Sequence, residues 1–213
     1  MTALLTLSHG SRHPRAAAGI DRLTAAAGER LGVTARAAHL EFNAPSLIDA
    51  TRSLAAAGHH AAVVVPLLFT HAFHARHDVP AALAAARDAS GLELHPAPGL
   101  GTGEDIAALL AARTRPPAGA ELTLAHVGSS DERAEEAVAD LARRVGERLG
   151  RAVSVRRATG TRASISKNSH LIPLFVTDGL LLDQMLASGA SADPPLAEDL
   201  ADIVAERYRR TAP

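Results

Sequence analysis

Residues 62–80 read AVVVPLLFTHAFHARHDVP, and this stretch decides the fold that we expect. It begins as an apolar run rich in β-branched residues, which is typical of a strand buried on both faces of a parallel sheet. It ends in three histidines, His71, His74 and His77, placed before the next predicted helix. A buried strand that delivers imidazoles at its carboxyl end predicts a metal site. The alternative is that these histidines are ordinary polar residues of a surface loop.

The segments around this strand alternate between strands and helices. Apolar runs predict strands at residues 3–8, 33–40, 61–68 and 92–95. Alanine-rich segments with helical spacing predict helices at residues 14–31, 47–57, 78–89 and 104–113. This alternation is typical of an α/β protein with a parallel sheet, because parallel neighbours need crossover connections.

Polar residues follow three of the predicted strands. His9, Gly10 and Ser11 come after the first strand, Glu41 after the second and the histidine cluster after the third. Ligand sites of open parallel sheets lie beyond the carboxyl ends of the strands, so these segments should meet at one edge. Gly10 and Ser11 would equally suit a plain turn between a strand and a helix.

Composition restricts the function classes. The chain has no cysteine and 11 histidines, so a metal would be held by nitrogen and oxygen ligands. Its 22 basic and 23 acidic residues give a net charge of −1, which does not favour a nucleic-acid partner. No apolar segment approaches the roughly 20 residues of a membrane span. The amino terminus lacks the features of a signal peptide, so we expect a cytoplasmic protein.

The pattern begins again after a Pro- and Gly-rich linker at residues 116–120. In this second half, HVGSSD at 126–131 echoes SHGS at 8–11, PLFVT at 173–177 echoes PLLFT at 66–70, and EDL at 198–200 echoes EDI at 104–106. The chain is therefore predicted to be an internal duplication, with domains at 1–115 and 121–213. The second copy has too little chain before Pro173 for both a helix and a full strand, so we expect it to be shortened.

The two copies can be compared with each other. Aligning their Gly-Ser pairs places Val127 opposite His9, and aligning Pro66 with Pro173 places Leu181 opposite His74. In a looser alignment, Glu41 falls near Thr159. The second copy thus keeps the apolar frame and loses the side chains that bind metals, which favours a functional role for these residues in the first copy. His126, one position from the counterpart of His9, could be a slipped equivalent.

These residues resemble the sirohydrochlorin chelatases, a class II chelatase family of the CbiX and SirB type. The matching stretches are LLTLSHGSRHPRA at 4–16, LEFNAPSL at 40–47 and VVVPLLFTHAFHARHDVPAAL at 63–83. The resemblance implies two tandem α/β chelatase-like domains, each with a four-stranded parallel sheet flanked by helices, facing a cleft within one monomer. It also implies ATP-independent insertion of Co²⁺ or Fe²⁺, with Ni²⁺ as a further candidate, into sirohydrochlorin for siroheme or cobalamin synthesis, with no further cofactor.

The resemblance assigns roles to individual residues. It makes His9 and His74 the metal-binding and catalytic pair, with Glu41 as the nearby carboxylate. His71 and His77 stand where the family does not lead us to expect histidines, and we take them as surface or supporting residues. Because sirohydrochlorin carries many carboxylates, we expect contacts to it from Gly10, Ser11, Arg12 and Arg76, with Arg15 as a further candidate.

Two other functions are compatible with parts of the pattern. A non-enzymatic carrier of metal or tetrapyrrole would use the same histidines without accelerating metallation. A phosphohydrolase is suggested by His9-Gly10 beside Arg12, but it would need an arginine directly before the histidine, where Ser8 stands. The chain has no GxxxxGK[ST] loop, which disfavours ATP-driven insertion.

Overall fold

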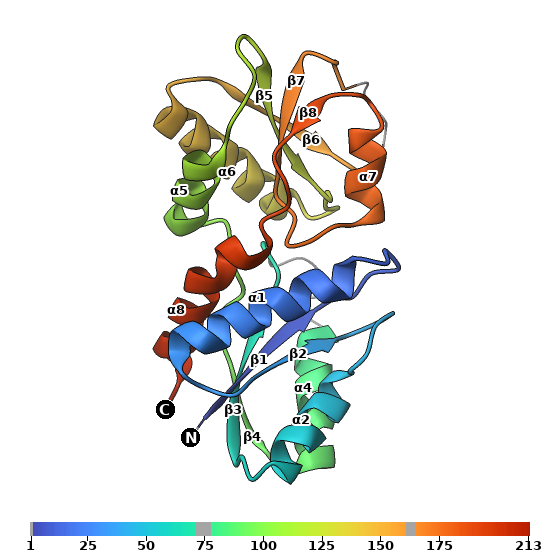
Figure 1. Cartoon of the computed structure of the whole chain (residues 1–213), viewed down its shortest axis with the longest axis vertical. Coiled ribbons are helices and arrows are strands. Elements are labelled where there is room, and N and C mark those ends of the chain that lie inside the picture. The colour runs from blue at the N-terminus through green and yellow to red at the C-terminus, as the bar shows by residue number, and fades with distance from the viewer. Residues whose placement is uncertain (1, 71–77, 161–164) are drawn as a thin grey trace. The chain divides into compact units, whose positions relative to one another are not determined.

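The computed structural model describes residues 2–70, 78–160 and 165–213 of the chain. These residues form two compact units, one of residues 1–101 with 197–213 and one of residues 102–196. Both units combine a parallel sheet with helices, as Figure 1 shows. No helix within the described ranges has the length and apolar character needed to cross a membrane.

The first unit is built on the sheet β2-β1-β3-β4, in which all neighbours are parallel. Its strands are β1 (Ala3–Ser8), β2 (Ala35–His39), β3 (Ala61–Pro66) and β4 (Glu93–Pro96). The two central strands, β1 and β3, are almost wholly buried, which explains their continuous apolar runs. The predicted parallel α/β sheet is therefore confirmed, with its second and third strands shorter than expected.

Helices cover both faces of this sheet. On one face, α2 (Leu47–Ala56) packs against α4 (Asp78–Ser90), and their apolar side chains share a core with β1 and β3. Ser46 caps α2 by accepting a hydrogen bond from the Asp49 backbone N–H at 3.2 Å. On the other face, α1 (Ala16–Leu31) packs against β2 and ends at Gly32, whose φ is 65°.

The second unit repeats this plan with the sheet β6-β5-β7-β8. Its strands are β5 (Glu121–His126), β6 (Val153–Arg157), β7 (Ser169–Pro173) and β8 (Ser191–Ala192), and its helices are α5 (Glu104–Arg113), α6 (Glu132–Leu149) and α7 (Leu180–Leu186). The strand order matches that of the first sheet, so the predicted duplication is present in the topology. The copy is shortened as predicted: β8 has two residues, and the described part of the β6–β7 connection contains no counterpart of α2.

The units differ from the predicted domains, 1–115 and 121–213, in the placement of two helices. Helix α5 packs against α6 of the second unit, whereas α8 (Ala201–Thr211), which follows the 3₁₀ turn η1 (Ala197–Leu200), packs against α1 and β3 of the first. Hydrogen bonds hold α8 there: Tyr208 Oη donates to the Thr2 carbonyl at 2.6 Å, and Arg207 donates to the Leu100 carbonyl at 2.7 Å. The copies have thus exchanged their last helices, because α5 packs on α6 of the second copy and α8 packs on α1 and β3 of the first.

Candidate functional site

Strand β1 places His9 and Gly10 at the carboxyl edge of the first sheet, and the chain after β2 is bound to them. The Leu40 N–H donates to the Ser8 carbonyl at 3.0 Å, and the Glu41 N–H donates to the His9 carbonyl at 2.9 Å. These two bonds continue the parallel pairing of β1 with β2 past the end of the sheet. The backbones of His9 and Glu41 are therefore adjacent, as the sequence predicted for the strand ends.

Gly10 makes this close approach possible. Its φ is 95°, and a Cβ atom added there would stand 1.8 Å from the Glu41 carbonyl oxygen. No side chain fits at that distance, so the glycine is required by the contact between the two loops. Gly10 therefore serves the geometry of the site, whether or not it also touches a ligand.

Ser11 contributes to the turn rather than offering free donors. Its backbone N–H donates to the Asn43 Oδ1 at 2.8 Å, and its hydroxyl accepts from the His13 N–H at 3.0 Å. Helix α1 begins only at Ala16, with Arg15 at the N-cap position. The Ser11 amide is thus bonded within the turn, and the predicted contact of Ser11 with the substrate stays a prediction.

Phe42 and Arg12 lie beside His9. The Phe42 ring is 6.1 Å from the His9 ring, centroid to centroid, and the two planes meet at 85°. The Arg12 guanidinium carbon stands 4.7 Å from the centroid of the same phenyl ring. Perpendicular aromatic packing and a cation over a ring face are both attractive arrangements. Sequence reasoning identified Arg12 but missed Phe42, although the chain has only four phenylalanines and one stands directly after Glu41.

Two further histidines lie near this edge and were also missed. His39, at the end of β2, is 2% exposed, and its Nδ1 is 2.7 Å from the Ser8 hydroxyl. Burial lowers the pKa of His39 below its ordinary value, with a smaller opposing effect from Asp21. His13 is also buried, and its Nδ1 accepts from the Arg15 N–H at 3.2 Å. His13 bonds to the local chain and His39 bonds to the neighbouring strand β1, and such buried, bonded side chains are typical of structural histidines.

The remaining predicted residues lie outside the described ranges. These are His71, His74, Arg76 and His77. Among the residues that the structure describes, no group of three or more His, Asp or Glu side chains is placed to hold a metal ion. A set of three His, Asp or Glu ligands that includes His9 and Glu41 therefore needs a residue from segment 71–77, and His74 stays a prediction.

The second unit shows how the two copies correspond. The Ala158 N–H donates to the His126 carbonyl at 2.8 Å and the Thr159 N–H donates to the Val127 carbonyl at 3.1 Å, repeating the bonds of Leu40 and Glu41 in the first unit. Val127 is thus the counterpart of His9, Thr159 of Glu41 and His126 of Ser8. The interpretation of His126 as a slipped equivalent of His9 is wrong, because the strand register places it one residue earlier.

The side chains at this second edge pair with one another. His126 Nε2 lies 3.7 Å from Glu135, which also lies 3.5 Å from Arg157 and accepts from the Ser129 N–H at 2.6 Å. Burial lowers the pKa of His126, Glu135 opposes this, and Arg157 adds to the lowering. The cation close to the carboxylate makes this cluster a poor cation site. Val127, 45% exposed at the position of His9, offers no metal ligand.

A pocket of about 760 Å³ opens in the second unit between β6 and α7. Its lining includes Arg156, Thr159, Ile165, Gln184 and Met185. In the first unit, the counterparts of β6 and α7 are β2 and α4, which both contact α2. The pocket therefore occupies the place where the second unit has no such helix in its described part.

Comparisons with known proteins place a family match in the first part of the chain. The family described as CbiX matches residues 3–116, which include His9, Glu41 and His74. The chain belongs to the CbiX family. A sirohydrochlorin cobaltochelatase of Sulfurisphaera tokodaii is 36% identical over 74 residues, which are 35% of this chain and 59% of the relative. The match thus spans less than two thirds of that relative's length.

Several solved structures share the fold of this CbiX-family chain over nearly its whole length. The SirB sirohydrochlorin chelatase of Bacillus subtilis subspecies spizizenii, in complex with cobalt, has a TM-score of 0.79 and 20% identity, covering 100% of this chain and 96% of its own. SirB of Bacillus subtilis with Fe³⁺ has a TM-score of 0.77 and 19% identity, with the same coverage. CbiX from denitrifying bacteria, described as the terminal enzyme of siroheme biosynthesis, has a TM-score of 0.69 and 20% identity, covering 99% of each chain. At these identities the likeness establishes the fold.

Proposed function

We propose that this protein inserts Co²⁺ or Fe²⁺ into sirohydrochlorin without ATP, as a lyase of siroheme or cobalamin biosynthesis. The observation that carries the proposal is the bonded pairing of the His9 and Glu41 segments at the carboxyl edge of a sheet whose residues match the CbiX family. The name of the Sulfurisphaera relative supports the same substrate and one of the two metals.

We assign the metal to His9, His74 and Glu41 as a substrate in transit. Neutral imidazoles suit ions such as Co²⁺, Fe²⁺ and Ni²⁺, and three ligands leave coordination positions open for the nitrogens of the macrocycle. Four strong protein ligands would retain the ion. Moderate affinity lets it leave for the four nitrogens of the ring.

Insertion also requires the loss of two pyrrole protons. The divalent ion replaces these two protons, so the ring loses two positive charges as protons and gains two with the metal. Glu41 and the imidazoles of His9 and His74 are the groups proposed to accept them, since a base with a pKa near neutrality is the most useful there. The protons then pass to water.

The carboxylates of sirohydrochlorin need cationic partners. Arg12 is exposed, its guanidinium stands over the Phe42 ring, and it can form paired hydrogen bonds with a carboxylate. Arg76 stays a predicted partner. The Gly10 and Ser11 backbone forms the turn below this contact, and its role is to fix the place of His9. We further propose that the protein acts as a cytoplasmic monomer without nucleic acid, membrane or another cofactor.

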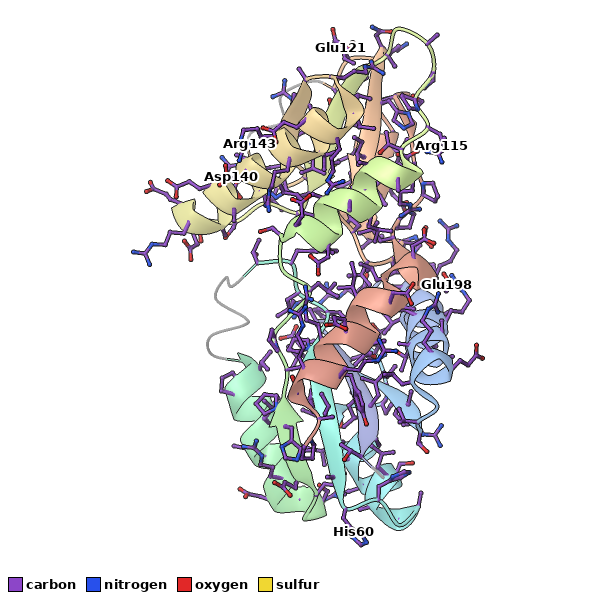
Figure 2. The ribbon with its side chains drawn as sticks, turned by 90° about the vertical axis from the view of Figure 1, so that its left-hand side faces the viewer. His60, Arg115, Glu121, Asp140, Arg143 and Glu198 are labelled. Atoms are coloured by element: carbon purple, nitrogen blue, oxygen red, sulfur yellow. The ribbon has the colours of Figure 1, made fainter. Side chains whose placement is uncertain are left out.

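The test is the rate of metal insertion, followed by the visible absorption of sirohydrochlorin. We expect the protein to accelerate insertion of Co²⁺ or Fe²⁺, and the double variant His9→Ala/His74→Ala to lose about a hundredfold of the rate. His60→Ala is the matched control, since Figure 2 shows His60 pointing away from the ribbon. His60 precedes β3, whereas His9 follows the parallel strand β1, so the two lie at opposite edges of the sheet. His60→Ala should keep the full rate.

Two outcomes would contradict the proposal in different ways. A double variant as fast as the unmodified protein would show that the assigned residues are wrong. Equal rates with and without protein would instead support a carrier of metal or tetrapyrrole, the alternative that uses the same residues.

A further inference from the structure

Phe42 occupies a position that a phenylalanine adopts only at an energetic cost. Its φ is 62°, in the left-handed region where Cβ meets the following carbonyl. The Asn43 N–H donates to the Glu41 carbonyl at 2.7 Å, so Phe42 is the middle residue of a three-residue turn. With a positive φ this is the strained form of that turn. Glycine or asparagine would close it at lower cost.

The phenyl ring gains little in exchange from burial. Phe42 is 52% exposed, the highest fraction among the exposed large hydrophobic residues within the described ranges. Most phenylalanine side chains stabilise the folded protein because folding buries them away from water. A strained backbone that holds an exposed aromatic ring indicates that the ring contacts a bound molecule.

The surroundings of the ring define that contact. The loop is held from below, because the Glu41 carbonyl rests on Gly10 and the Asn43 side chain accepts from the Ser11 N–H at 2.8 Å. The ring itself stands perpendicular to the His9 ring and carries the Arg12 guanidinium at 4.7 Å. An aromatic surface, a cation and an imidazole are therefore fixed next to one another.

We propose that Phe42 is a contact residue for the flat conjugated ring of a tetracarboxylate or polycarboxylate macrocycle, and that it sets the distance between that ring and His9. This inference rests on the proposed function, and it adds the residue that recognises the apolar part of the substrate. The phenyl group packs against the conjugated ring, and Arg12 pairs with a carboxylate at its rim. Without this contact the macrocycle binds through its charges alone and is less well placed over the metal ligands.

The experiment measures binding of metal-free sirohydrochlorin to the full chain by the change in its absorption or fluorescence. Phe42→Asn should raise the dissociation constant about fivefold, since it removes one aromatic contact. Phe42→Tyr, which keeps the ring, should stay within about twofold of the unmodified protein. Leu186→Asn is the matched control: Leu186 is also an exposed large hydrophobic residue, but it lies on α7, and its replacement should leave the constant unchanged.

The melting temperature separates this proposal from a purely structural role of Phe42, which predicts that its replacement lowers the melting temperature. If Phe42 instead serves to contact the substrate, Phe42→Asn should leave the melting temperature unchanged or raise it, because asparagine tolerates a positive φ. Binding of Co²⁺ alone should also be unaffected. A lower melting temperature with an unchanged affinity for sirohydrochlorin would overturn the inference, as would equal losses in the Asn and Tyr variants.

The same measurements separate this inference from the proposed function. If the unmodified protein accelerates metallation while Phe42→Asn binds the macrocycle normally, only the inference fails. If the unmodified protein binds the macrocycle in a way that depends on Phe42 but does not accelerate metallation, only the proposed chelatase activity fails. If the unmodified protein does not bind sirohydrochlorin, both fail.

Discussion

At the scale of single residues, two histidines at the carboxyl edge of the first sheet, His9 and His39, have different surroundings. His9 extends beyond β1 next to Glu41, whereas His39 is enclosed at the end of β2 and bonds to Ser8. Protonated His39 would need an acceptor for Nε2 as well, and that atom is buried with no hydrogen-bond partner among the residues described. This explains why burial lowers its pKa, and it suits a structural histidine beside His9, the proposed metal ligand.

The lowered pKa of His39 predicts how stability changes with pH. Below the ordinary histidine value of 6.5, the unfolded chain binds the proton more readily than the folded protein, so the free energy of unfolding falls as pH decreases. His126 contributes in the same direction because burial also lowers its pKa. We expect the melting temperature to drop between pH 7.5 and about pH 5.5, and the drop to be smaller in His39→Gln.

The control for this prediction is His60→Gln, which replaces an exposed histidine and should leave the pH dependence as it is in the unmodified protein. A His39→Gln variant whose melting temperature falls as steeply as that of the unmodified protein would show that His39 is not responsible.

At the scale of elements, the exchange of the last helices decides what each unit needs in order to fold. Figure 2 shows α8 lying along the first unit, beside α1. An ion pair of 2.6 Å between Arg30 and Asp202 joins these two helices, and Val204 of α8 is fully buried. The first sheet is therefore completed by the chain's end rather than by α5, its nearest helix in sequence.

Replacing one buried side chain of α8 tests this arrangement. Val204→Ala should lower the free energy of unfolding by about 2 kcal/mol, because it deletes two methyl groups from a packed interior. Amide hydrogen exchange should accelerate in α1 and β3, while exchange in α5 and α6 stays unchanged. Arg209→Ala, on an exposed position of the same helix, is the control and should change neither. Faster exchange in α5 and α6 alone would contradict the assignment of α8 to the first unit.

At the scale of the whole molecule, duplication has produced two sheets of the same order with different edges. The backbone bonds at the two edges are the same, but His9 and Glu41 in one unit correspond to Val127 and Thr159 in the other. At the second edge, Arg157 also forms an ion pair with Glu135 at 3.5 Å. The first edge thus carries the proposed ligands His9 and Glu41, whereas the second has Val127 and Thr159 at the corresponding positions.

This asymmetry predicts one metal ion per chain, bound with moderate affinity. Equilibrium dialysis with Co²⁺ should give a stoichiometry near one, which His9→Ala should abolish. His126→Asn should leave it unchanged, because His126 is the counterpart of Ser8 and not of a predicted ligand. Two Co²⁺ ions bound per chain would assign metal binding to the second unit as well. A His126→Asn variant that binds less Co²⁺ than the unmodified protein would do the same.

Much of the fold was determined by the sequence itself. Burial of parallel strands on both faces imposes continuous apolar runs, so β1 and β3 could be recognised directly, and helix ends such as Ser46 and Gly32 are set by local chemistry. The meeting of His9 and Glu41 followed from the rule that parallel strands end at a common edge. The repeated motifs established the duplication, and the comparison of the two copies singled out the residues that only the first copy has.

Other features were decided only by tertiary structure. Helices α5 and α8 carry similar sequences, EDIAALLAAR and ADIVAERYRRT, and nothing local specifies which sheet each will cover, because that choice depends on apolar surfaces distant in the chain. The register of His126 depends on pairing with β6 and β7, and the burial of His39 on its contact with Ser8. The positive φ and the exposed ring of Phe42 likewise arise from the packing of its loop on Gly10, since contacts between distant segments set both.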